Sequence, residues 1–431
     1  MKKIIVALML VCLLTISLVG CTQEQEVEPT NAPETEESPV EENVEEPTEE
    51  VVVTYWHTMS EPEAEQLETV ISAFESENPG ITVEATKYAY DDFKSAIITS
   101  LSGNSGPDVA RMDIAWVSQF ADDEALLKLS DELSSFDEIA GSVFEGPLST
   151  NYWQDGYYGL PLNTNTQVLL WNRELFEAAG LNAPPTTMDE FKTYAKQIAD
   201  TSDDVYGYAL GGTYFWAPAP IFYTMGGKVT DEAITTATGY VNSKESVEAF
   251  TLLKEMYDEG SISPNLLGGG IGTSDGLATN LYGMIIDGPW MVDIYAGQFP
   301  DFEVNFAMMP TQNGYTSSVV GGEDVVVFYN TDAKDASLKW VEFLMSEQAQ
   351  VAMSQVGVVP TLKSLVGSNE VPEYFDIFMK QLETAQARVP HPAWGEMDGA
   401  INNAFQRILN GDQTAQEALD QAADEINALL D

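Results

Sequence analysis

The sequence predicts an α/β fold made of two lobes, and three features support this. Segments rich in β-branched residues alternate with helical segments, which predicts parallel strand–helix–strand units in an open sheet. The stretch from 51 to 431 is longer than one ordinary domain. We expect the chain to cross between the lobes near Asn163, near Val319 and near Val371, and so few crossings predict a hinge.

The first strand and helix carry clear boundary signals. Val51–Trp56 has the β-branched content of a strand. Ser60 and Glu63 stand at the spacing of a capping box, and Asn-Pro-Gly at 78–80 ends the helix that they begin. Further strands are expected at 81–86, 108–112, 167–171, 206–210, 282–286 and 325–329. Further helices are expected at 90–101, 174–179, 187–200, 243–259, 333–345, 346–357, 372–386, 396–409 and 414–430.

Residues 1–20 have the pattern of a lipoprotein signal peptide. Lys2 and Lys3 precede an apolar run, which ends in Leu-Val-Gly before Cys21. A membrane-spanning anchor is the alternative, but the apolar run is short for one. We therefore expect cleavage before Cys21 and acylation of that residue, with palmitate among the lipids, so that a lipoprotein is held at the outside of the cell membrane.

The next segment, 21–50, is predicted to be an acidic disordered tether, because Glu, Pro and Thr dominate it and it has no aromatic residue. The two lobes are expected to follow it. We assign the N-terminal lobe to 51–164 with 320–370, and the C-terminal lobe to 165–319 with 371–431.

Charge and histidine content argue against several classes of function. With 69 acidic and 18 basic residues the chain has a formal charge of -51, which argues against binding to nucleic acid or to anionic lipid. Its two histidines, His57 and His391, are far apart in sequence, so histidine metal sites and Ser-His-Asp chemistry are not expected. We expect no metal, no cofactor and a monomeric protein.

Aromatic, acidic and amide side chains stand at the ends of three predicted strands. They are Trp56 and His57 after the first strand, Asp113 and Trp116 after the third, and Asn163 and Asn165 in a polar run before 167–171. Open α/β sheets bind ligands beyond the carboxyl ends of their strands. A flat ring covers the C–H face of a sugar and polar groups bind its hydroxyls, so this set predicts a carbohydrate site.

Several motifs stand in a specific order along most of the chain. They are FESENPGITVE from Phe74, GPDVARMD from Gly106, YGLP from Tyr158, LLWNRELFEAAG from Leu169, MIIDGPW from Met284 and VVGGEDVVVFYN from Val319. In this order they resemble the extracellular solute-binding proteins of bacterial ABC sugar importers, especially the maltose and maltodextrin branch. The resemblance implies a two-lobed periplasmic-binding-protein-like fold with an interlobe ligand cleft, a mono- or oligosaccharide ligand, and delivery to a membrane permease.

The resemblance also implies roles for aromatic residues in the second half of the chain. It assigns sugar stacking to Trp290, which the turn from Asp287 positions at a strand end, and it includes Asp287 itself among the ligand-binding residues. It places another stacking ring at either Tyr214 or Trp216, and a further aromatic at Trp394.

Two polar candidates depend on the same resemblance. Asn165 stands where maltodextrin-binding members have an acid, so a charge-assisted hydrogen bond is missing here. Glu323 either accepts hydrogen bonds from a sugar or neutralises a neighbouring Lys or Arg.

Other interpretations compete with these. Trp56 and Trp290 are equally consistent with core positions, because tryptophan is often largely buried. A surface-anchored glycoside hydrolase also has acids and aromatics in a cleft, but no carboxylate pair at matched strand ends is evident, so we do not expect an enzyme. A binding protein for a non-sugar solute is the third alternative.

Overall fold

A computed structural model of the chain describes residues 50–103 and 105–430. These residues belong to one compact unit. The predicted signal peptide, Cys21 and almost all of the tether lie outside the described residues. No helix among the described residues is long and apolar enough to cross a membrane.

The first lobe is built on a five-stranded sheet in the order β2-β1-β3-β11-β6. Its strands are β1 Val51–His57, β2 Ile81–Lys87, β3 Val109–Asp113, β6 Gly159–Thr166 and β11 Val320–Val327. β1 pairs in parallel with β2 and β3, as the strand–helix spacing predicts. β11 runs antiparallel to both β3 and β6, so the far edge of the sheet is not parallel.

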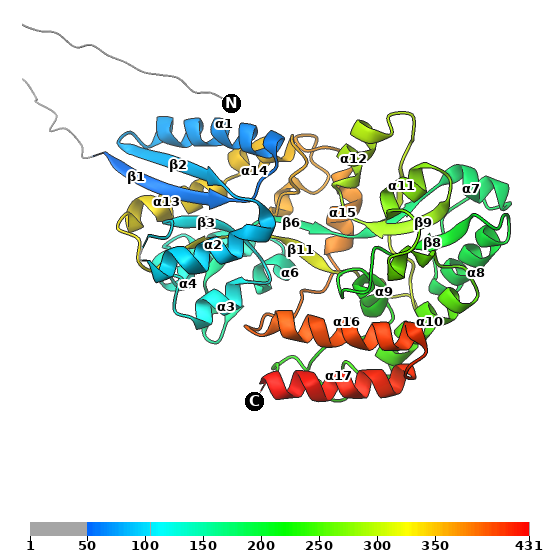
Figure 1. The fold of residues 1–431 in the computed structure, drawn as a ribbon. Helices are drawn as coiled ribbons and strands as arrows, with labels where there is room; N and C mark the ends of the chain where they lie inside the picture. The colour runs from blue at the N-terminus through cyan, green and yellow to red at the C-terminus, as the bar shows by residue number, and fades with distance from the viewer. Residues whose placement is uncertain (1–49, 104, 431) are drawn as a thin grey trace, which may run out of the picture. The chain divides into compact units, whose positions relative to one another are not determined.

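The second lobe contains a four-stranded sheet in the order β10-β7-β9-β8 (Figure 1). Its strands are β7 Val168–Trp171, β8 Tyr206–Ala209, β9 Tyr282–Asp287 and β10 Asn305–Ala307. β8 and β9 are parallel, whereas β7 is antiparallel to β9 and β10. A two-stranded hairpin, β4 Tyr152–Trp153 and β5 Gly156–Tyr157, lies apart from both sheets.

Helices cover both sheets. Those that precede β6 or follow β11 directly are α1 Glu61–Glu77, α2 Tyr90–Ser102, α3 Val117–Asp122, α4 Leu129–Glu132, α5 Phe136–Ser142, α6 Glu145–Ser149, α13 Lys334–Leu344 and α14 Glu347–Ser354. Those of the second lobe are α7 Arg173–Ala178, α8 Met188–Ala199, α9 Ala219–Thr224, α10 Lys244–Asp258, α11 Thr273–Ala278, α12 Met291–Gln298, α16 Trp394–Asn410 and α17 Ala415–Leu430. α15, Phe375–Leu382, contributes Phe375 to the core of the first lobe and Phe378 to a core cluster of the second.

Local sequence signals explain where several helices begin and end. The side chain of Ser60 accepts a hydrogen bond from the Glu63 backbone while Glu63 accepts one from the Ser60 backbone, so the predicted capping box is confirmed. Gly180 follows the C-cap of α7 and has a φ of 75°, a left-handed conformation that suits a glycine just after a helix. Most other predicted helices and strands are confirmed with ends that differ by a few residues.

Two boundary predictions are wrong. The polar run Asn163–Thr166 belongs to β6 itself, and β11 begins at Val320, not at Val325. The hydroxyls of this run are satisfied by the neighbouring strand, since Thr164 donates to the Gly321 carbonyl and Thr166 to the Val319 carbonyl. Polar residues that find partners in this way fit a buried strand.

Three segments lie side by side where the two lobes meet. The Ser318 hydroxyl donates to the Gln167 carbonyl over 2.7 Å, and the Gln386 amide donates to the Ser318 carbonyl over 2.8 Å. The Val320 amide in turn donates to the Gln386 carbonyl over 2.9 Å. Because Gln167 alone separates β6 from β7, the chain passes from one sheet to the other at this residue.

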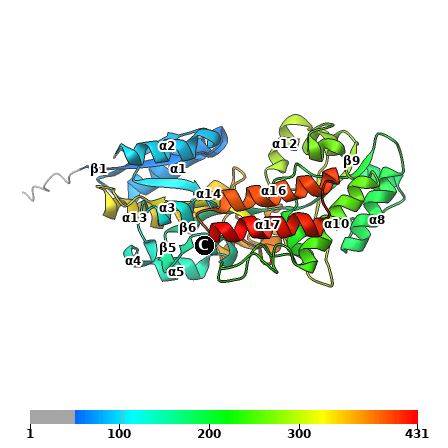
Figure 2. The ribbon, with the colours of Figure 1, turned by 60° about the horizontal axis from the view of Figure 1, so that its bottom comes forward.

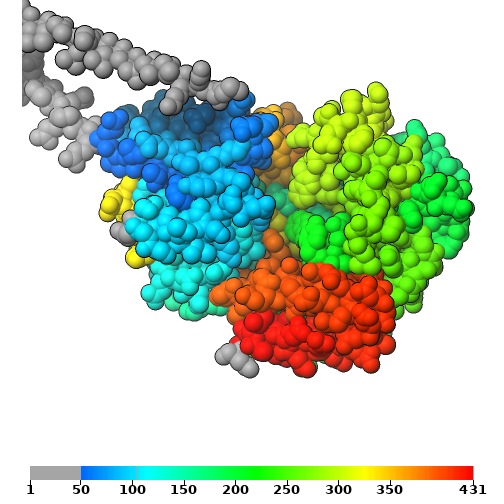
Figure 3. Space-filling view, viewed as in Figure 1, coloured from blue at the N-terminus to red at the C-terminus, as the bar shows by residue number. Residues whose placement is uncertain are grey.

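The two C-terminal helices lie beside each other along the second lobe (Figure 2). α16 and α17 supply Ile401, Phe405 and Leu419 to the core of that lobe. In the space-filling view the surface is hollowed between the first lobe, in blue and cyan, and the second lobe, in green (Figure 3). The N-terminal end of α16 borders this hollow.

Candidate functional site

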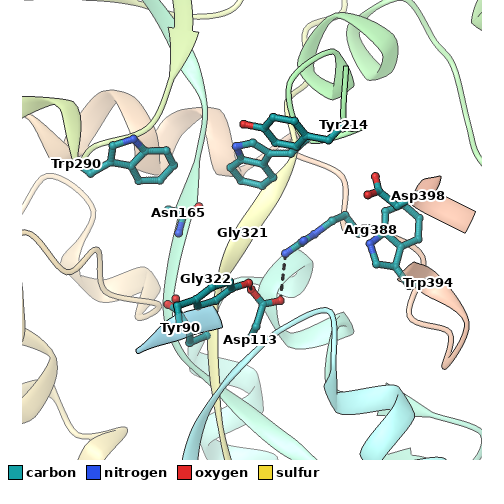
Figure 4. A pocket seen from close by; sticks show the side chains of 12 residues that line it. Tyr90, Asp113, Asn165, Tyr214, Trp290, Gly321, Gly322, Arg388, Trp394 and Asp398 are labelled. Carbon is teal, nitrogen blue, oxygen red and sulfur yellow. Dashed lines mark hydrogen bonds and ion pairs between the residues drawn. The ribbon is translucent and has the colours of Figure 1, made fainter. Parts of the chain in front are cut away.

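A cavity of about 320 Å³ lies between the two lobes (Figure 4). The first lobe and its strands β6 and β11 contribute Tyr90, Asp113, Asn165, Gly321, Gly322 and Glu323 to its lining. The other side is formed by Tyr214, Trp216, Trp290, Arg388, Trp394 and Asp398. Its walls therefore combine four aromatic residues from one side with mostly polar groups from the other.

The floor of the cavity depends on two glycines of β11. Asn165 of β6 pairs with Gly321, where a β-carbon would lie 2.2 Å from Asn165 Oδ1 and 2.6 Å from the Trp216 ring. Gly322 has a φ of 127°, and a β-carbon there would lie 2.3 Å from the Asn163 carbonyl oxygen. Only glycine allows this backbone geometry and this close approach of Trp216 and Asn165.

A buried network holds Glu323 at the edge of the cavity. Arg111 donates from one guanidinium nitrogen to Glu323 Oε2 over 2.7 Å and from Nε to Asn163 Oδ1 over 3.1 Å. Asn163 Nδ2 also donates to Glu323 Oε2 over 2.7 Å. Burial raises the pKa of Glu323, and the charge of Arg111 opposes that rise. Glu323 thus neutralises an arginine, which is one of the two predicted alternatives. It also lines the cavity, and its role as an acceptor for a sugar stays a prediction.

Asp113 and Arg388 meet from opposite sides of the cavity. Asp113 ends β3, and its Oδ1 lies 3.6 Å from a guanidinium nitrogen of Arg388. The Tyr90 hydroxyl donates to Asp113 Oδ2 over 2.9 Å, and the Ala115 amide donates to Oδ1 over 2.8 Å. The Arg388 guanidinium also lies over the Trp216 ring, with its carbon 5.6 Å from the ring centroid. The Nε of Arg388 is buried and has no hydrogen-bond partner among the described residues.

Trp216, Trp290 and Tyr214 form an aromatic wall. The Trp216 and Trp290 rings are inclined by 32°, with centroids 6.5 Å apart. Trp290 remains 36% exposed and Tyr214 47% exposed, unlike most large aromatic residues of the chain. A β-carbon at Gly288 would lie 2.2 Å from the Trp290 indole. The glycine therefore allows the indole to pack against the backbone of the turn that precedes Trp290. Exposed rings in a cavity are available for stacking.

Trp394 and Asp398 border the cavity from one face of α16. Trp394 is only 5% exposed and contacts Phe215, with ring centroids 5.9 Å apart, so most of it belongs to the core. Asp398 Oδ1 accepts a hydrogen bond from the Phe215 amide over 3.1 Å. Burial raises the pKa of Asp398, whereas this hydrogen bond and Arg388 oppose the rise.

The cavity thus brings together seven of the twelve residues that the sequence predicts for the site. They are Asp113, Asn165, Tyr214, Trp216, Trp290, Glu323 and Trp394.

The other five lie elsewhere. Trp56 and His57 are part of β1, and Trp56 packs against Tyr88 with centroids 4.6 Å apart. His57 is 3% exposed, and burial, with help from Arg111, lowers its pKa to about 4, so it is a neutral core residue. They were expected at the end of the strand and just beyond it, but the strand continues through His57 and pairs with β2.

Asn163, Asp287 and Trp116 also lie outside the lining. Asn163 lies next to the lining, where its Nδ2 donates a hydrogen bond to Glu323 Oε2. Asp287 accepts a hydrogen bond from the Gly288 amide over 2.8 Å and so shapes the turn before Trp290. Burial raises its pKa to about 6. Trp116 borders a neighbouring chamber.

Sequence reasoning missed Tyr90, Arg388 and Asp398. Tyr90 was predicted only as the first residue of a helix, and its place beside Asp113 follows from the packing of α2. Arg388 follows α15 in a segment without a binding motif. The only signal for Asp398 was its distance of four residues from Trp394, which puts both on one face of a helix.

The chemistry of the cavity suits binding of a polar, ring-shaped solute. The aromatic wall offers stacking surface, while Asn165, Glu323 and Arg388 offer hydrogen-bonding groups. Among the described residues no group of three or more His, Cys, Asp or Glu side chains is placed to hold a metal ion. Neither histidine lines the cavity.

Comparison with known protein families decides the class. Residues 69–378 match the model of the bacterial extracellular solute-binding proteins. The chain belongs to this family. Membership means that this solute-binding protein acts outside the cytoplasm.

Individual relatives of this solute-binding protein are distant but cover most of it. A binding protein of Brucella abortus (strain 2308) is 26% identical over 372 residues, which is 84% of this chain and 89% of that protein. A solute-binding protein of an ABC transporter from Thermotoga lettingae, solved with α-D-tagatose, is 26% identical with a TM-score of 0.74, covering 88% and 100% of the two chains.

The cyclic α-maltosyl-1,6-maltose binding protein of Arthrobacter globiformis is 25% identical with a TM-score of 0.79, covering 88% of this chain and 99% of that one. These overlays confirm the predicted two-lobed fold.

Proposed function

We propose that this protein captures an uncharged carbohydrate in the interlobe cavity and delivers it to the permease of an ABC importer. One observation carries the proposal: the exposed ring of Trp290 and the partly buried ring of Trp216 line a cavity whose opposite side carries amide and carboxylate groups. Rings cover the C–H faces of a sugar and polar groups bind its hydroxyls. The Arthrobacter and Thermotoga relatives bind carbohydrates, which supports the same class of ligand here.

The charges that line the cavity favour a ligand without a negative charge. Asp113, Glu323 and Asp398 line it together with a single cation, Arg388, which is already paired with Asp113. An acidic or phosphorylated sugar would meet more carboxylates than cations. We therefore expect neutral sugars to bind in preference to their uronate or phosphate counterparts.

Binding without catalysis is the function that the carboxylates support. A glycoside hydrolase uses one carboxyl group as an acid and a second, free carboxylate on the other side of the bond. Here Glu323 is held by Arg111 and Asn163, and Asp113 is held by Tyr90, Ala115 and Arg388. These contacts restrain both groups as structural anchors. We infer that the protein is not an enzyme.

We propose that the lobes close on the ligand about the segments at Gln167, Ser318–Val320 and Gln386. The sequence assigns 51–164 with 320–370 to the N-terminal lobe and 165–319 with 371–431 to the C-terminal lobe. Because β6 extends to Thr166 and Phe375 packs in the core of the first lobe, the crossings lie somewhat later in the chain, at Gln167 and near Gln386. Ligand contacts from both sides of the cavity would stabilise the closed state. The protein acts as a monomer in this scheme.

We further propose that lipid on Cys21 holds the protein at the cell membrane and that 21–50 is a spacer. The Leu-Val-Gly-Cys sequence after an apolar run supports the lipid. The glutamate-rich composition supports an extended tether.

Thermal melting with a panel of sugars tests the proposed ligand class. The panel contains tagatose, galactose, maltose and maltotriose, beside galacturonate and glucose 6-phosphate as charged counterparts. We expect at least one neutral sugar to raise the melting temperature and the charged counterparts to have little effect. Stabilisation only by charged ligands, or by none, would reject the proposal. Release of reducing ends from maltotriose would instead indicate a hydrolase.

A further inference from the structure

The Trp216 ring is carried by a turn, so side chains from other elements must hold it in place. Trp216 stands between β8 and α9 and belongs to neither a strand nor a helix. One residue earlier, the Phe215 amide donates to Asp398 on α16. The backbone carbonyl of Trp216 itself accepts a hydrogen bond from Gln167 Nε2 over 2.7 Å. Gln167 thus holds the residue that carries the ring.

Gln167 occupies a special place in the chain. It is the single residue between β6 and β7, where the chain passes from one sheet to the other. Its own carbonyl accepts a hydrogen bond from the Ser318 hydroxyl over 2.7 Å, and the residue is only 2% exposed. The backbone of Gln167 is therefore fixed at the crossing, and its side chain joins the crossing to the turn that carries Trp216.

The Trp216 ring has little freedom to move without changing the cavity. A β-carbon at Gly321 would lie 2.6 Å from this ring. The Arg388 guanidinium carbon lies 5.6 Å from its centroid, and the Trp290 ring centroid lies 6.5 Å from it. A shift of the Trp216 backbone would therefore alter the spacing of the aromatic wall and the position of the ring above the floor.

A buried glutamine can also serve the fold alone. Gln350 of α14 is an example, because it is 4% exposed and its Nε2 donates to the Leu162 carbonyl over 2.6 Å. Gln167 makes the same kind of hydrogen bond, but its acceptor belongs to a residue that lines the cavity. Neither glutamine lines the cavity itself. The two residues therefore allow a matched comparison.

We propose that Gln167 is a positioning residue for carbohydrate binding: its side-chain amide holds the Trp216 backbone so that the ring is in place to contact the sugar. This inference rests on the proposed function. Gln167 does not touch the ligand and acts only through Trp216. The position of this ring is therefore set from the crossing between the sheets as well as from the second lobe.

Gln167→Met tests the proposal, because methionine is similar in length and lacks the amide donor. The ligand is the sugar among tagatose, galactose, maltose and maltotriose that binds the native protein most tightly. We expect calorimetric titration to show about fivefold or more weaker binding, as the loss of one buried hydrogen bond implies. Gln350→Met is the matched control, and it should keep native affinity within about twofold.

A double-mutant cycle separates positioning from a general structural role. If Gln167 acts through the Trp216 ring, Gln167→Met should change the affinity of a Trp216→Ala protein by less than about twofold. A merely structural defect would weaken binding by the same factor in both backgrounds. Thermal melting of every variant shows whether it is folded.

Gln167→Glu is a second variant, which keeps the shape of the side chain. Its carboxyl group donates to the Trp216 carbonyl only while protonated. Its affinity relative to the native protein, measured at each pH from 5 to 9, should therefore fall as the pH rises.

The inference is overturned if Gln167→Met keeps native affinity, or if its loss is undiminished in the Trp216→Ala protein. Should Gln167→Met prove unfolded, a relative affinity of Gln167→Glu that is constant with pH overturns it. In each of these cases the native protein still binds its sugar, so the proposed function stands. If the native protein binds no sugar of the panel, the proposed function itself fails.

Discussion

Asn165 and Gly321 face each other in the pairing of β6 with β11, and the Asn165 amide oxygen occupies the space where a side chain at position 321 would begin. This oxygen is buried and has no hydrogen-bond partner among the described residues. A ligand hydroxyl is a suitable donor for it. Gly321 therefore leaves space for the Asn165 side chain, and the Asn165 amide oxygen is available to accept a hydrogen bond from a ligand hydroxyl.

Gly321→Ala should lower ligand affinity by about tenfold or more, because the new methyl group displaces Asn165 and Trp216 from the floor of the cavity. Calorimetric titration with the best sugar of the panel measures this. Gly141→Ala on α5 is the matched control, since a β-carbon there meets no atom within 4 Å, and it should bind normally. Unchanged affinity in the Gly321 variant would show that Gly321 and its neighbours Asn165 and Trp216 are not part of the ligand site.

Local signals predicted much of the fold. The capping box at Ser60 and the β-branched segments depend on neighbours in sequence, so they are readable without the tertiary structure. The aromatic candidates Trp290, which stands in the motif MIIDGPW, and Trp216, which the family resemblance indicates, were also predicted from the sequence. Both line the cavity.

The failures have tertiary causes. The polar run at 163–166 does not look like a strand, because its partners are the glycines and carbonyls of β11, more than a hundred and fifty residues away. Arg111 was not predicted as the partner of Glu323 for the same reason. Tyr90 and Arg388 enter the site only through the packing of α2 and the segment after α15.

A saturating neutral sugar should reduce the radius of gyration of the protein in solution. The expected cause is closure about the segments at Gln167, Ser318 and Gln386, which connect the lobes by few hydrogen bonds. Small-angle X-ray scattering with and without the sugar measures it. Identical profiles at full occupancy would reject a closing motion.

Asp287→Asn should reduce the loss of stability that accompanies rising pH. Burial raises the pKa of Asp287 from 3.8 to about 6, so the folded state favours its protonated form. This contribution to stability is fully present below pH 3.8 and is lost as the pH rises through about 6.

Between pH 5 and pH 8 the unfolding free energy of the native protein should therefore fall by about 1 kcal/mol more than that of the Asn variant. Urea unfolding at the two pH values compares them. Burial also raises the pKa of Glu323, Asp324 and Asp398, but these groups are present in both proteins. If the unfolding free energies of the two proteins change equally between pH 5 and pH 8, ionisation of Asp287 does not destabilise the folded state.

Cys21→Ser should release the protein from the membrane fraction without affecting sugar binding. The reason is that the thiol of Cys21 is the expected site of lipid attachment, whereas the ligand cavity lies in the two lobes. Cell fractionation followed by melting of the released protein with the best sugar measures both. A variant that stays in the membrane fraction would argue for another anchor.

An exposed aromatic wall between the lobes should bind the carbohydrate, and the substitution Trp290→Ala tests this role most directly. Trp290 is 36% exposed and lines the cavity, so its loss should cost about 2 kcal/mol of binding, roughly thirtyfold in affinity, with little change in melting temperature. Trp394→Ala is the contrasting variant, because Trp394 is 5% exposed and its loss should cost about 3 kcal/mol or more of stability. Calorimetric titration and thermal melting of both variants with the same sugar decide the matter. A Trp290 variant that is destabilised but keeps native affinity would contradict the account.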